Sequence, residues 1–503
     1  MKTNLQQSHL DTKGTTPADK KRKSDLNSIV LLKIWQGSKD RELAPLGLLF
    51  IGNELRKEGY QVYVYQWDKH NAMQNLEIIL DHNPFLVGFS MITGDPMQQI
   101  IMMSEALKEK MAETSIVYGG VHPTLEPKQC LAEKSVDFIV THEGEAVIAQ
   151  LANAIRDKKD PSNIKGIGFK KNGQIVINEF PDFQKDLDKY EMDWSLIDIE
   201  KYIWSNYHGE NRVLMGYVAS RGCPHNCAFC HNLVFNRRTY RKPSAKKVID
   251  DVNRLSKKNN FDGIVFYDDN FTVNKKWSLE VIKGIQLEAF HVETRIDYIT
   301  EEYIQEMYEA GVRSFFLGVE SGSDRILKLL CKGFKKEKII ESLLIMDKYP
   351  IDVKISLIVG VPTESIQEYK ETLKFIDWSL SNLKRIDISF GSYLPFPGTP
   401  LYNLCLKRGF EKPKSLVEWG KLDRWGNQNL AIPWTEGIFL TSLEVKKVRN
   451  IIEKIVDLKK KNQFWSKIQY TLLRMRILIS GSKFIFRLYS LDSFLIRMFG
   501  IKL

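Results

Sequence analysis

The stretch Arg221-Gly-Cys-Pro-His-Asn-Cys-Ala-Phe-Cys-His231 carries three cysteines at the spacing C-x3-C-x2-C. Three thiolates on one short loop can hold three corners of a cubane [4Fe–4S] cluster, because thiolate is the soft ligand that iron–sulfur clusters and zinc both select. The fourth iron then lacks a protein ligand and is free to bind and reduce a small molecule. We therefore predict that Cys223, Cys227 and Cys230 ligate a [4Fe–4S] cluster.

Zinc is the alternative metal for such a loop. The common zinc spacings combine a cysteine pair with a second Cys or His pair farther along the chain, and no second pair follows here. His225 and His231 lie too close to the cysteines in the sequence to complete a well-shaped tetrahedral set. The spacing therefore favours the cluster over zinc.

The loop resembles the signature of radical S-adenosylmethionine (radical SAM) enzymes, and the resemblance extends past the cysteines. A strand-like run, Gly216–Ser220, leads into the loop, and Phe229 fills the position where this family usually carries an aromatic residue. Five later segments follow in order and resemble the strand ends of the family's partial (β/α)6 barrel: Phe266–Phe271, Glu293–Asp297, Leu317–Gly322, Ile358–Glu364 and Leu394–Leu401.

The resemblance implies that the barrel binds S-adenosylmethionine (SAM) on the open iron and cleaves it to a 5′-deoxyadenosyl radical. Residues at the strand ends around a barrel mouth are placed to contact such a ligand. We expect Arg295 to pair with the SAM carboxylate, because a guanidinium forks onto a carboxylate, and Glu320 to bond the ribose hydroxyls or the amino group. Each charged residue has a structural alternative, a salt bridge within the barrel. The other expected SAM contacts are Phe229, Asp268, Asp269, Gly360 and Val361.

Upstream of the barrel, the sequence alternates apolar strands with helical patterns. The runs Ile29–Ile34, Leu86–Ser90 and Ser115–Gly120 are typical of strands in a buried parallel sheet. This rhythm predicts a doubly wound, flavodoxin-like α/β sheet, which binds its ligands at the carboxyl ends of its strands.

Two of these strand ends indicate the ligand. Ser90 and Gly119-Gly120 resemble the serine and double-glycine positions of the cobalamin-binding domain that precedes many radical SAM barrels. The Asp-x-His-x-x-Gly element that supplies a histidine to cobalt is absent, and the corresponding loop reads Trp35–Arg41. The resemblance therefore implies cobalamin bound without a histidine from this loop, with a vestigial, empty domain as the alternative. We expect His122 and His142 to be structural.

Composition limits the remaining partners. The net charge of +11 over 503 residues could favour a nucleic acid, an anionic membrane or an anionic substrate. No RRM aromatic pair or GxxG loop is present, so we expect no nucleic acid partner. Six cysteines, three of them in one loop, do not form a disulfide framework, and they fit a reducing cytoplasm.

We predict five segments along the chain. They are a disordered, Lys-rich leader (1–27), a cobalamin-binding domain (28–160), a connector with short strands (161–205), a radical SAM core (206–430) and a helical C-terminal region (431–503). In the last segment, the tail 464–503 mixes aromatic and aliphatic residues with Arg and Lys, and no apolar run reaches the roughly 18 residues that span a bilayer. The tail is either a helix pair that caps the barrel, which we favour slightly, or a peripheral membrane contact.

The resemblance implies a cytoplasmic, cobalamin-dependent radical SAM methyltransferase. Such an enzyme transfers a methyl group from SAM, via methylcobalamin, to an unactivated carbon of a small or lipid-like substrate, and it needs an electron donor such as flavodoxin or ferredoxin. One alternative is oxidative cyclisation, ring rearrangement or C–C bond formation with the same cofactors. The other is a non-catalytic cobalamin or redox sensor. A methylthiotransferase is disfavoured because its extra N-terminal cysteine set is missing.

Overall fold

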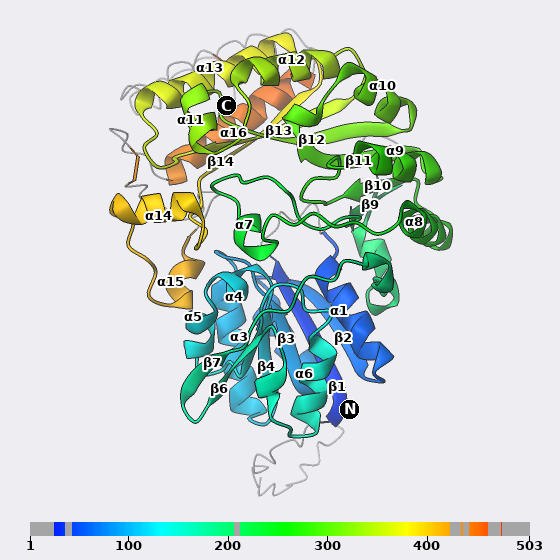
Figure 1. Cartoon of the computed structure of the whole chain (residues 1–503), viewed down its shortest axis with the longest axis vertical. Coiled ribbons are helices and arrows are strands. Elements are labelled where there is room, and N and C mark those ends of the chain that lie inside the picture. Colours follow the sequence, from blue (N-terminus) through cyan, green and yellow to red (C-terminus); the bar gives the residue numbers. More distant parts are fainter. Residues whose placement is uncertain are drawn as a thin grey trace, which may run out of the picture.

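The chain builds two α/β layers, each on a seven-stranded sheet, and the two sheets lie one above the other along the long axis of the molecule (Figure 1). The computed structural model describes residues 25–35, 43–205, 212–422, 434–435, 442–460 and 474. The α/β class expected from the sequence is confirmed.

The first sheet has the strand order β2-β1-β3-β4-β5-β6-β7. Its first five strands are parallel, and the order reverses between β1 and β3, as in a flavodoxin-like sheet. Leu31 of β1 packs into the core on one face and Leu32 into the core on the other, which explains the unbroken apolar run. The elements are β1 (Asp25–Trp35), α1 (Leu46–Lys57), β2 (Gln61–Asp68), α2 (Leu76–Asp81), β3 (Pro84–Ser90), α3 (Met97–Lys110), β4 (Ser115–Gly119), α4 (Val121–Leu125), α5 (Pro127–Ala132), β5 (Phe138–Val140) and α6 (Ile148–Arg156).

Two antiparallel strands extend this sheet beyond the expected five. They are β6 (Ile167–Lys171) and β7 (Gln174–Ile177), which form a hairpin on the edge of β5. The sequence pattern predicted both strands within the connector, and the structure shows that they join the first sheet. The boundaries of the five segments stay a prediction.

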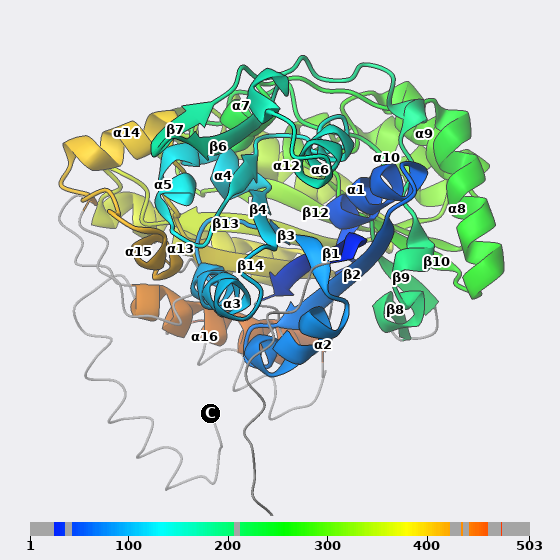
Figure 2. The same ribbon diagram turned by 90° about the horizontal axis from the view of Figure 1, so that it is seen from below.

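The second sheet has the order β14-β13-β12-β11-β10-β9-β8, in which β9 to β14 are parallel. Figure 2 shows from below how this sheet and its outer helices lie behind the first sheet. In the part of the chain that the structure describes, β14 and β8 are the two ends of the sheet, so the arc is open. The elements are β8 (Ile203–Ser205), β9 (Arg212–Tyr217), α7 (Asn232–Phe235), α8 (Ala245–Asn259), β10 (Gly263–Phe266), α9 (Lys275–Gly284), β11 (Ala289–Arg295), α10 (Glu301–Glu309), β12 (Val312–Glu320), α11 (Asp324–Leu329), α12 (Lys336–Met346), β13 (Asp352–Val359), α13 (Ile366–Asn382) and β14 (Ile386–Ser392).

After β14 the chain returns to the first domain. Helix α14 (Pro400–Lys407) leads to α15 (Leu416–Gly420), which packs against α3. Trp419 of α15 is fully buried there, and its indole Nε1 donates a hydrogen bond to Oε1 of Gln129 at 2.7 Å. The two sheets are therefore joined by packing as well as by the connector.

Within the region 431–503, which the sequence predicts to be helical, α16 (Ser442–Lys460) packs against β14 with Val448 and Ile452 in the core. Most of the leader (1–24) and the tail 464–503, apart from position 474, lie outside the described residues. In the part that is described, no helix is long and apolar enough to cross a membrane.

Candidate active site

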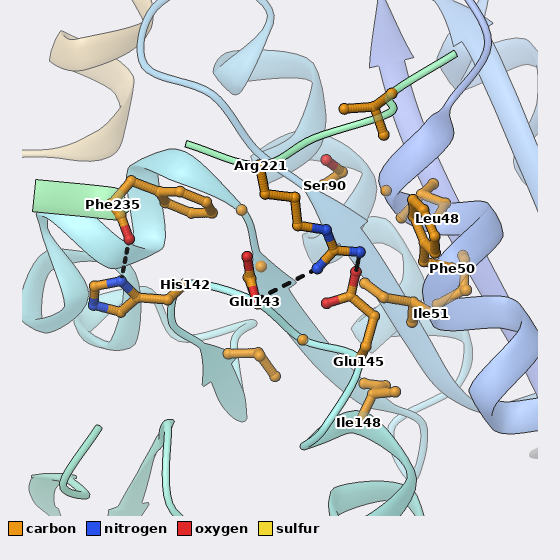
Figure 3. Close-up of a pocket in the computed structure, with 18 of the residues that line it drawn as sticks. Leu48, Phe50, Ile51, Ser90, His142, Glu143, Glu145, Ile148, Arg221 and Phe235 are labelled. Carbon is orange, nitrogen blue, oxygen red and sulfur yellow. Dashed lines mark hydrogen bonds and ion pairs between the residues drawn. The ribbon is translucent and has the colours of Figure 1, made fainter. Parts of the chain in front are cut away.

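A large cavity lies between the two sheets, at the carboxyl ends of the first sheet's parallel strands (Figure 3). It contains about 1110 Å³ of empty space, part of it open to solvent. Ser90, Gly119 and Gly120 all line this cavity. The structure thus brings together the three residues predicted to contact cobalamin.

The walls of the cavity are mainly apolar, as in most cofactor pockets. One wall is formed by α1, whose residues Leu48, Phe50 and Ile51 are labelled in Figure 3. Gly120 has φ 97°, and a Cβ there would lie 3.0 Å from the Met91 carbonyl oxygen, so only glycine fits without strain. Glycine at this position therefore keeps the end of β4 free of a side chain.

The two histidines in this region have different surroundings. His142 lines the cavity, and its Nδ1 donates to the Phe235 carbonyl oxygen at 2.6 Å. Burial lowers the pKa of His142 to about 4. His122 is fully buried against Trp419, with the ring centroids 5.4 Å apart, and burial lowers its pKa to about 3. Both imidazoles are therefore neutral near pH 7, and their structural role stays a prediction.

The cavity also contains charged residues that the sequence reasoning missed. The Arg221 guanidinium bonds Glu145 with Nη2 2.7 Å from Oε1, and its Nη1 lies 3.4 Å from Oε2 of Glu143 (Figure 3). Arg221 stands two positions before Cys223, and Glu143 and Glu145 follow β5 in the other domain. The one sequence feature that could have indicated a functional role for Arg221 is its position beside the cysteine motif.

The cysteine loop is held in place by segments that follow the strands of the second sheet. The Ala228 N–H donates to the Leu330 carbonyl oxygen at 3.0 Å, and the Leu401 N–H donates to the Ala228 carbonyl oxygen at 3.1 Å. Asp268 accepts a hydrogen bond from the Ala219 N–H at 3.1 Å and others from Ser220. The loop that carries the cysteines is therefore positioned by hydrogen bonds from several segments around it.

Asp269 supports the same loop by accepting a hydrogen bond from the Gly222 N–H at 3.0 Å. Burial raises the pKa of Asp268 to about 7, although the hydrogen bonds from Ser220 and Ala219 act to lower this pKa. The structure therefore gives both aspartates a role in positioning the cysteine loop. Their predicted contacts with the SAM ammonium stay predictions.

The donor set around the cysteines fits a [4Fe–4S] cluster. Arg295 Nη1 donates to Cys227 Sγ at 3.1 Å, and Asn270 Nδ2 lies 3.9 Å from Cys223 Sγ. Such donors suit cluster-bound thiolates, because hydrogen bonds to the sulfurs tune the cluster. Burial raises the pKa of the Cys230 thiol to about 12, against a hydrogen bond from the Asn232 backbone.

Among the described residues, no three His, Cys, Asp or Glu side chains surround the position of a single metal ion. A cubane is larger than one ion, so its ligand sulfurs lie farther apart than the ligands of a zinc site. The loop, the thiols and the nearby N–H donors therefore remain compatible with the predicted cluster.

All three nitrogens of the Arg295 guanidinium already donate hydrogen bonds within the protein. Its Nε and Nη2 fork onto the Asp297 carboxylate at 3.0 and 2.9 Å, and Nη2 also donates to the Lys332 carbonyl oxygen. Burial alone would lower the pKa of Arg295. The hydrogen bond to Asp297, helped by smaller effects of nearby charges, is stronger, so the pKa of Arg295 is raised. The salt bridge weighed from the sequence is therefore present, and the contact of Arg295 with SAM stays a prediction.

Glu320 belongs to a buried ion pair at the end of β12. Its Oε1 lies 3.3 Å from Nζ of Lys332, and its Oε2 accepts from Ser356 Oγ at 3.1 Å. A Cβ at Gly318 would lie 2.8 Å from Glu320 Oε1, so the missing side chain in mid-strand makes room for the pair. Lys332 Nζ also lies 5.8 Å from the centroid of the Phe229 ring. Glu320 and Phe229, two residues of the predicted SAM site, thus both lie beside Lys332.

The sequence reasoning missed Lys332, because a lysine in a loop is usually solvated. Here its side chain is only 3% exposed. A buried ion pair loses much of its attraction to desolvation, so its presence is weak support for a purely stabilising role. Buried charged pairs are frequent at functional sites.

Gly360 and Val361 form a turn that a buried carboxyl group holds. Their N–H groups donate to Glu364 Oε2 at 2.5 and 3.2 Å. Burial raises the pKa of Glu364 to about 8. The backbone donors of this turn are thus occupied, and the predicted contact with adenine stays a prediction.

Two family models match the chain. One is the B12 binding domain, over residues 38–152, and the other is the radical SAM superfamily, over residues 217–376. The chain belongs to the radical SAM superfamily and carries a B12-binding domain. The radical SAM match includes the three cysteines, and the B12-binding match includes Ser90 and Gly119-Gly120. The resemblance noted from the sequence is confirmed.

Relatives support this assignment. An uncharacterized methyltransferase of Pyrococcus horikoshii is 27% identical over 77% of this radical SAM chain and 85% of its own length. The anaerobic magnesium-protoporphyrin IX monomethyl ester cyclase of Synechocystis is 32% identical over 62% of this chain and 63% of its own length. The chain therefore spans less than two thirds of the cyclase.

The fold resembles that of the radical SAM methyltransferase TsrM from Kitasatospora setae, solved with cobalamin and a [4Fe–4S] cluster bound. The TM-score is 0.62 at 16% identity, over 90% of this chain and 99% of TsrM. The expected fold, an N-terminal B12-binding domain followed by a partial radical SAM barrel and a helical C-terminal part, is confirmed. The protein is an enzyme, and its cofactors are the [4Fe–4S] cluster, SAM and cobalamin.

Proposed function

We propose that this enzyme transfers a methyl group from SAM, by way of cobalamin, to an unactivated carbon of a small or lipid-like substrate. The observation that carries the proposal is the shared cavity. Ser90 and Gly119 reach it from the B12-binding domain, and Arg221 and Gly222 reach it from the cysteine loop. A ligand in this cavity touches both domains, as methyl transfer between two cofactors requires.

The residues of the site divide between the cofactors. Cys223, Cys227 and Cys230 would hold the cluster, and the cavity would hold cobalamin. When bound, the cluster supplies the electron that cleaves SAM, and cobalamin supplies a methyl group for transfer. Around them, Asp268 and Asp269 fix the cysteine loop through the backbone bonds described above.

The Glu320–Lys332 pair is complementary to the methionine end of SAM. That end carries one carboxylate and one ammonium group, and the pair offers one cation and one anion within 3.3 Å of each other. Charge-assisted hydrogen bonds of this kind contribute about 1.5–3 kcal/mol each. We therefore include Lys332 with Arg295 and Glu320 among the residues that position SAM.

A second candidate function is oxidative cyclisation with the same cofactors. The observation that favours it is the 32% identity to the magnesium-protoporphyrin ester cyclase, which is above the 27% to the methyltransferase of Pyrococcus horikoshii. The alignment with the methyltransferase is longer, at 405 against 322 residues, and covers more of both chains. We therefore place methyl transfer first.

The products formed from SAM distinguish the candidates. Protein reconstituted anaerobically with cluster and hydroxocobalamin is given SAM, a strong reductant and an extract of small molecules and lipids. A methyltransferase forms S-adenosylhomocysteine together with 5′-deoxyadenosine, and a product gains one CH2 unit in mass. A cyclase forms 5′-deoxyadenosine without S-adenosylhomocysteine, and a sensor forms neither. The electron donor and any membrane contact of the tail stay predictions.

A further inference from the structure

Four charged residues with little exposed surface join the cysteine loop to the B12-binding domain at the wall of the cavity. We call Arg221, Arg241, Glu143 and Glu145 the charge clamp. Arg221 bonds both glutamates, and Arg241 Nη1 donates to Glu143 Oε2 at 2.9 Å. The side chains of all four are between 5% and 14% exposed. Figure 3 shows the Arg221 guanidinium reaching from the cysteine loop to the two carboxylates.

The two arginines are fixed relative to each other by the backbone. The Arg221 N–H donates to the Arg241 carbonyl oxygen at 2.8 Å, and the Arg241 N–H donates back at 3.0 Å. Arg221 also lies over the Phe50 ring of α1, with 4.7 Å between the guanidinium carbon and the ring centroid. One arginine therefore contacts both α1 and the loop after β5, next to the strand ends that line the cavity.

The clamp is not needed merely to hold the domains together. Buried ion pairs repay their desolvation poorly, and apolar packing serves cohesion at least as well. That packing exists elsewhere, where Trp419 of α15 is buried against the first domain. The clamp differs from apolar packing in two ways. A guanidinium fork holds its partners in one geometry, and Arg221 stands only two residues before Cys223.

We propose that the charge clamp sets the position of the B12-binding domain relative to the cysteine loop, and with it the separation of the two cofactors. Arg221 is the central positioning residue, because it alone contacts both glutamates and leads directly into the cysteine motif. This inference rests on the proposed function, because it requires that the cluster and cobalamin both bind to the same protein molecule.

The test compares three variants of the full chain. Arg221→Gln removes the charge and the fork, and Arg221→Lys keeps the charge but loses the fork. Lys412→Gln is the matched control, because Lys412 forms another ion pair between the domains, 2.7 Å from Glu126, and does not line the cavity. Corrinoid and iron contents are measured first, so that every signal is expressed per bound cofactor.

In the holoenzyme, the measured quantity is the spin relaxation rate of cob(II)alamin. The reduced cluster speeds the spin relaxation of cob(II)alamin in a strongly distance-dependent way, which electron paramagnetic resonance measures without substrate. We expect the wild type and Lys412→Gln to show the same enhancement, Arg221→Gln to lose it in large part, and Arg221→Lys to fall between them. An unchanged enhancement in Arg221→Gln overturns the proposal, and if that variant does not fold, Arg221→Lys decides in the same way.

A second readout needs no cofactor. In the protein without cofactors, hydrogen exchange at residues 141–148 and 219–224 should be faster in Arg221→Gln than in the wild type, and unchanged in Lys412→Gln. Equal exchange in the wild type and Arg221→Gln overturns the clamp. A wild type that binds no corrinoid refutes the proposed function instead, and hydrogen exchange alone then decides whether the clamp exists.

Discussion

Nη1 of Arg295 lies 3.1 Å from Sγ of Cys227. A strand of the barrel thus places a permanent positive charge on a sulfur that the sequence predicts to be a cluster ligand. The rest of the guanidinium is bonded to Asp297 and to the carbonyl oxygen of Lys332. Because a donor to sulfur stabilises the more negative, reduced cluster, we predict that Arg295 affects electron transfer in addition to its predicted contact with SAM.

Arg295→Met should lower the reduction potential of the cluster. Loss of a charge-assisted hydrogen bond of about 1.5 kcal/mol corresponds to roughly 60 mV for a one-electron couple. If Arg295 also contacts SAM, affinity should fall roughly 10- to 150-fold. Redox titration followed by electron paramagnetic resonance, without SAM, measures the first effect. Arg313→Met, which removes a β12 arginine bonded to backbone carbonyls, is the control. An unchanged potential contradicts the role of Arg295.

Replacing any one of Cys223, Cys227 and Cys230 by Ala should remove most of the cluster absorbance and all cleavage of SAM, because three thiolates hold the cubane. Cys331→Ala is the control, since that cysteine is exposed and should leave the iron content unchanged. Iron and sulfide are assayed after anaerobic reconstitution. Four irons retained in the triple Ala variant would show that the ligands lie elsewhere.

Glu320→Gln should weaken SAM binding by roughly 10- to 150-fold, because it removes an anionic acceptor whose bonds contribute about 1.5–3 kcal/mol. The loss leaves Lys332 buried without its carboxylate partner, so Lys332→Met is measured beside it. Equilibrium binding of SAM to the cluster-loaded protein gives the affinities, and circular dichroism checks the fold. Normal SAM binding in both variants would return the pair to a structural role.

Gly47→Leu should abolish corrinoid binding without harming the fold. Gly47 lines the cavity, and a Cβ there would meet no heavy atom within 4 Å, so a leucine projects into the space for the cofactor. Gly47 is in the first turn of α1, where leucine is favoured over glycine by up to about 1 kcal/mol. Gly47→Ala is the smaller control. Bound corrinoid is read from the absorption spectrum, and full occupancy in the leucine variant would place cobalamin elsewhere.

Glu364 should make stability fall as pH rises. Burial raises its pKa from 4.5 to about 8 in the folded state, so between these values the folded protein binds more protons than the unfolded chain. The free energy of unfolding then decreases by at most about 1.4 kcal/mol per pH unit from this group. Glu364→Gln should lose this slope. Urea unfolding of the apoprotein across that range measures it, and parallel slopes for both proteins would contradict the burial of the acid.

The residues at the strand ends could be predicted from sequence because their geometry is local. Ser90 ends β3 and Gly119 ends β4, and the carboxyl ends of neighbouring parallel strands meet at one edge of a sheet. Recognising two short strands therefore sufficed to place both residues in the same cavity.

The ion pairs could not be predicted in this way. Arg221 and Glu145 are separated by 76 positions, and the contact depends on how two domains dock, which no local pattern encodes. Lys332 could not be distinguished from a solvated lysine, because its burial depends on the room above Gly318. The docking of β6 and β7 on β5 was missed for the same reason, since pairing between short strands leaves little mark on the sequence.

The return of the chain through α15 has a kinetic consequence. Trp419 is fully buried against the first domain, so swinging that domain away from the barrel would expose an indole of about 200 Å², at a cost on the order of 5 kcal/mol. The open form would then be on the order of one molecule in several thousand. Any release of the corrinoid that requires this open form would therefore be rare.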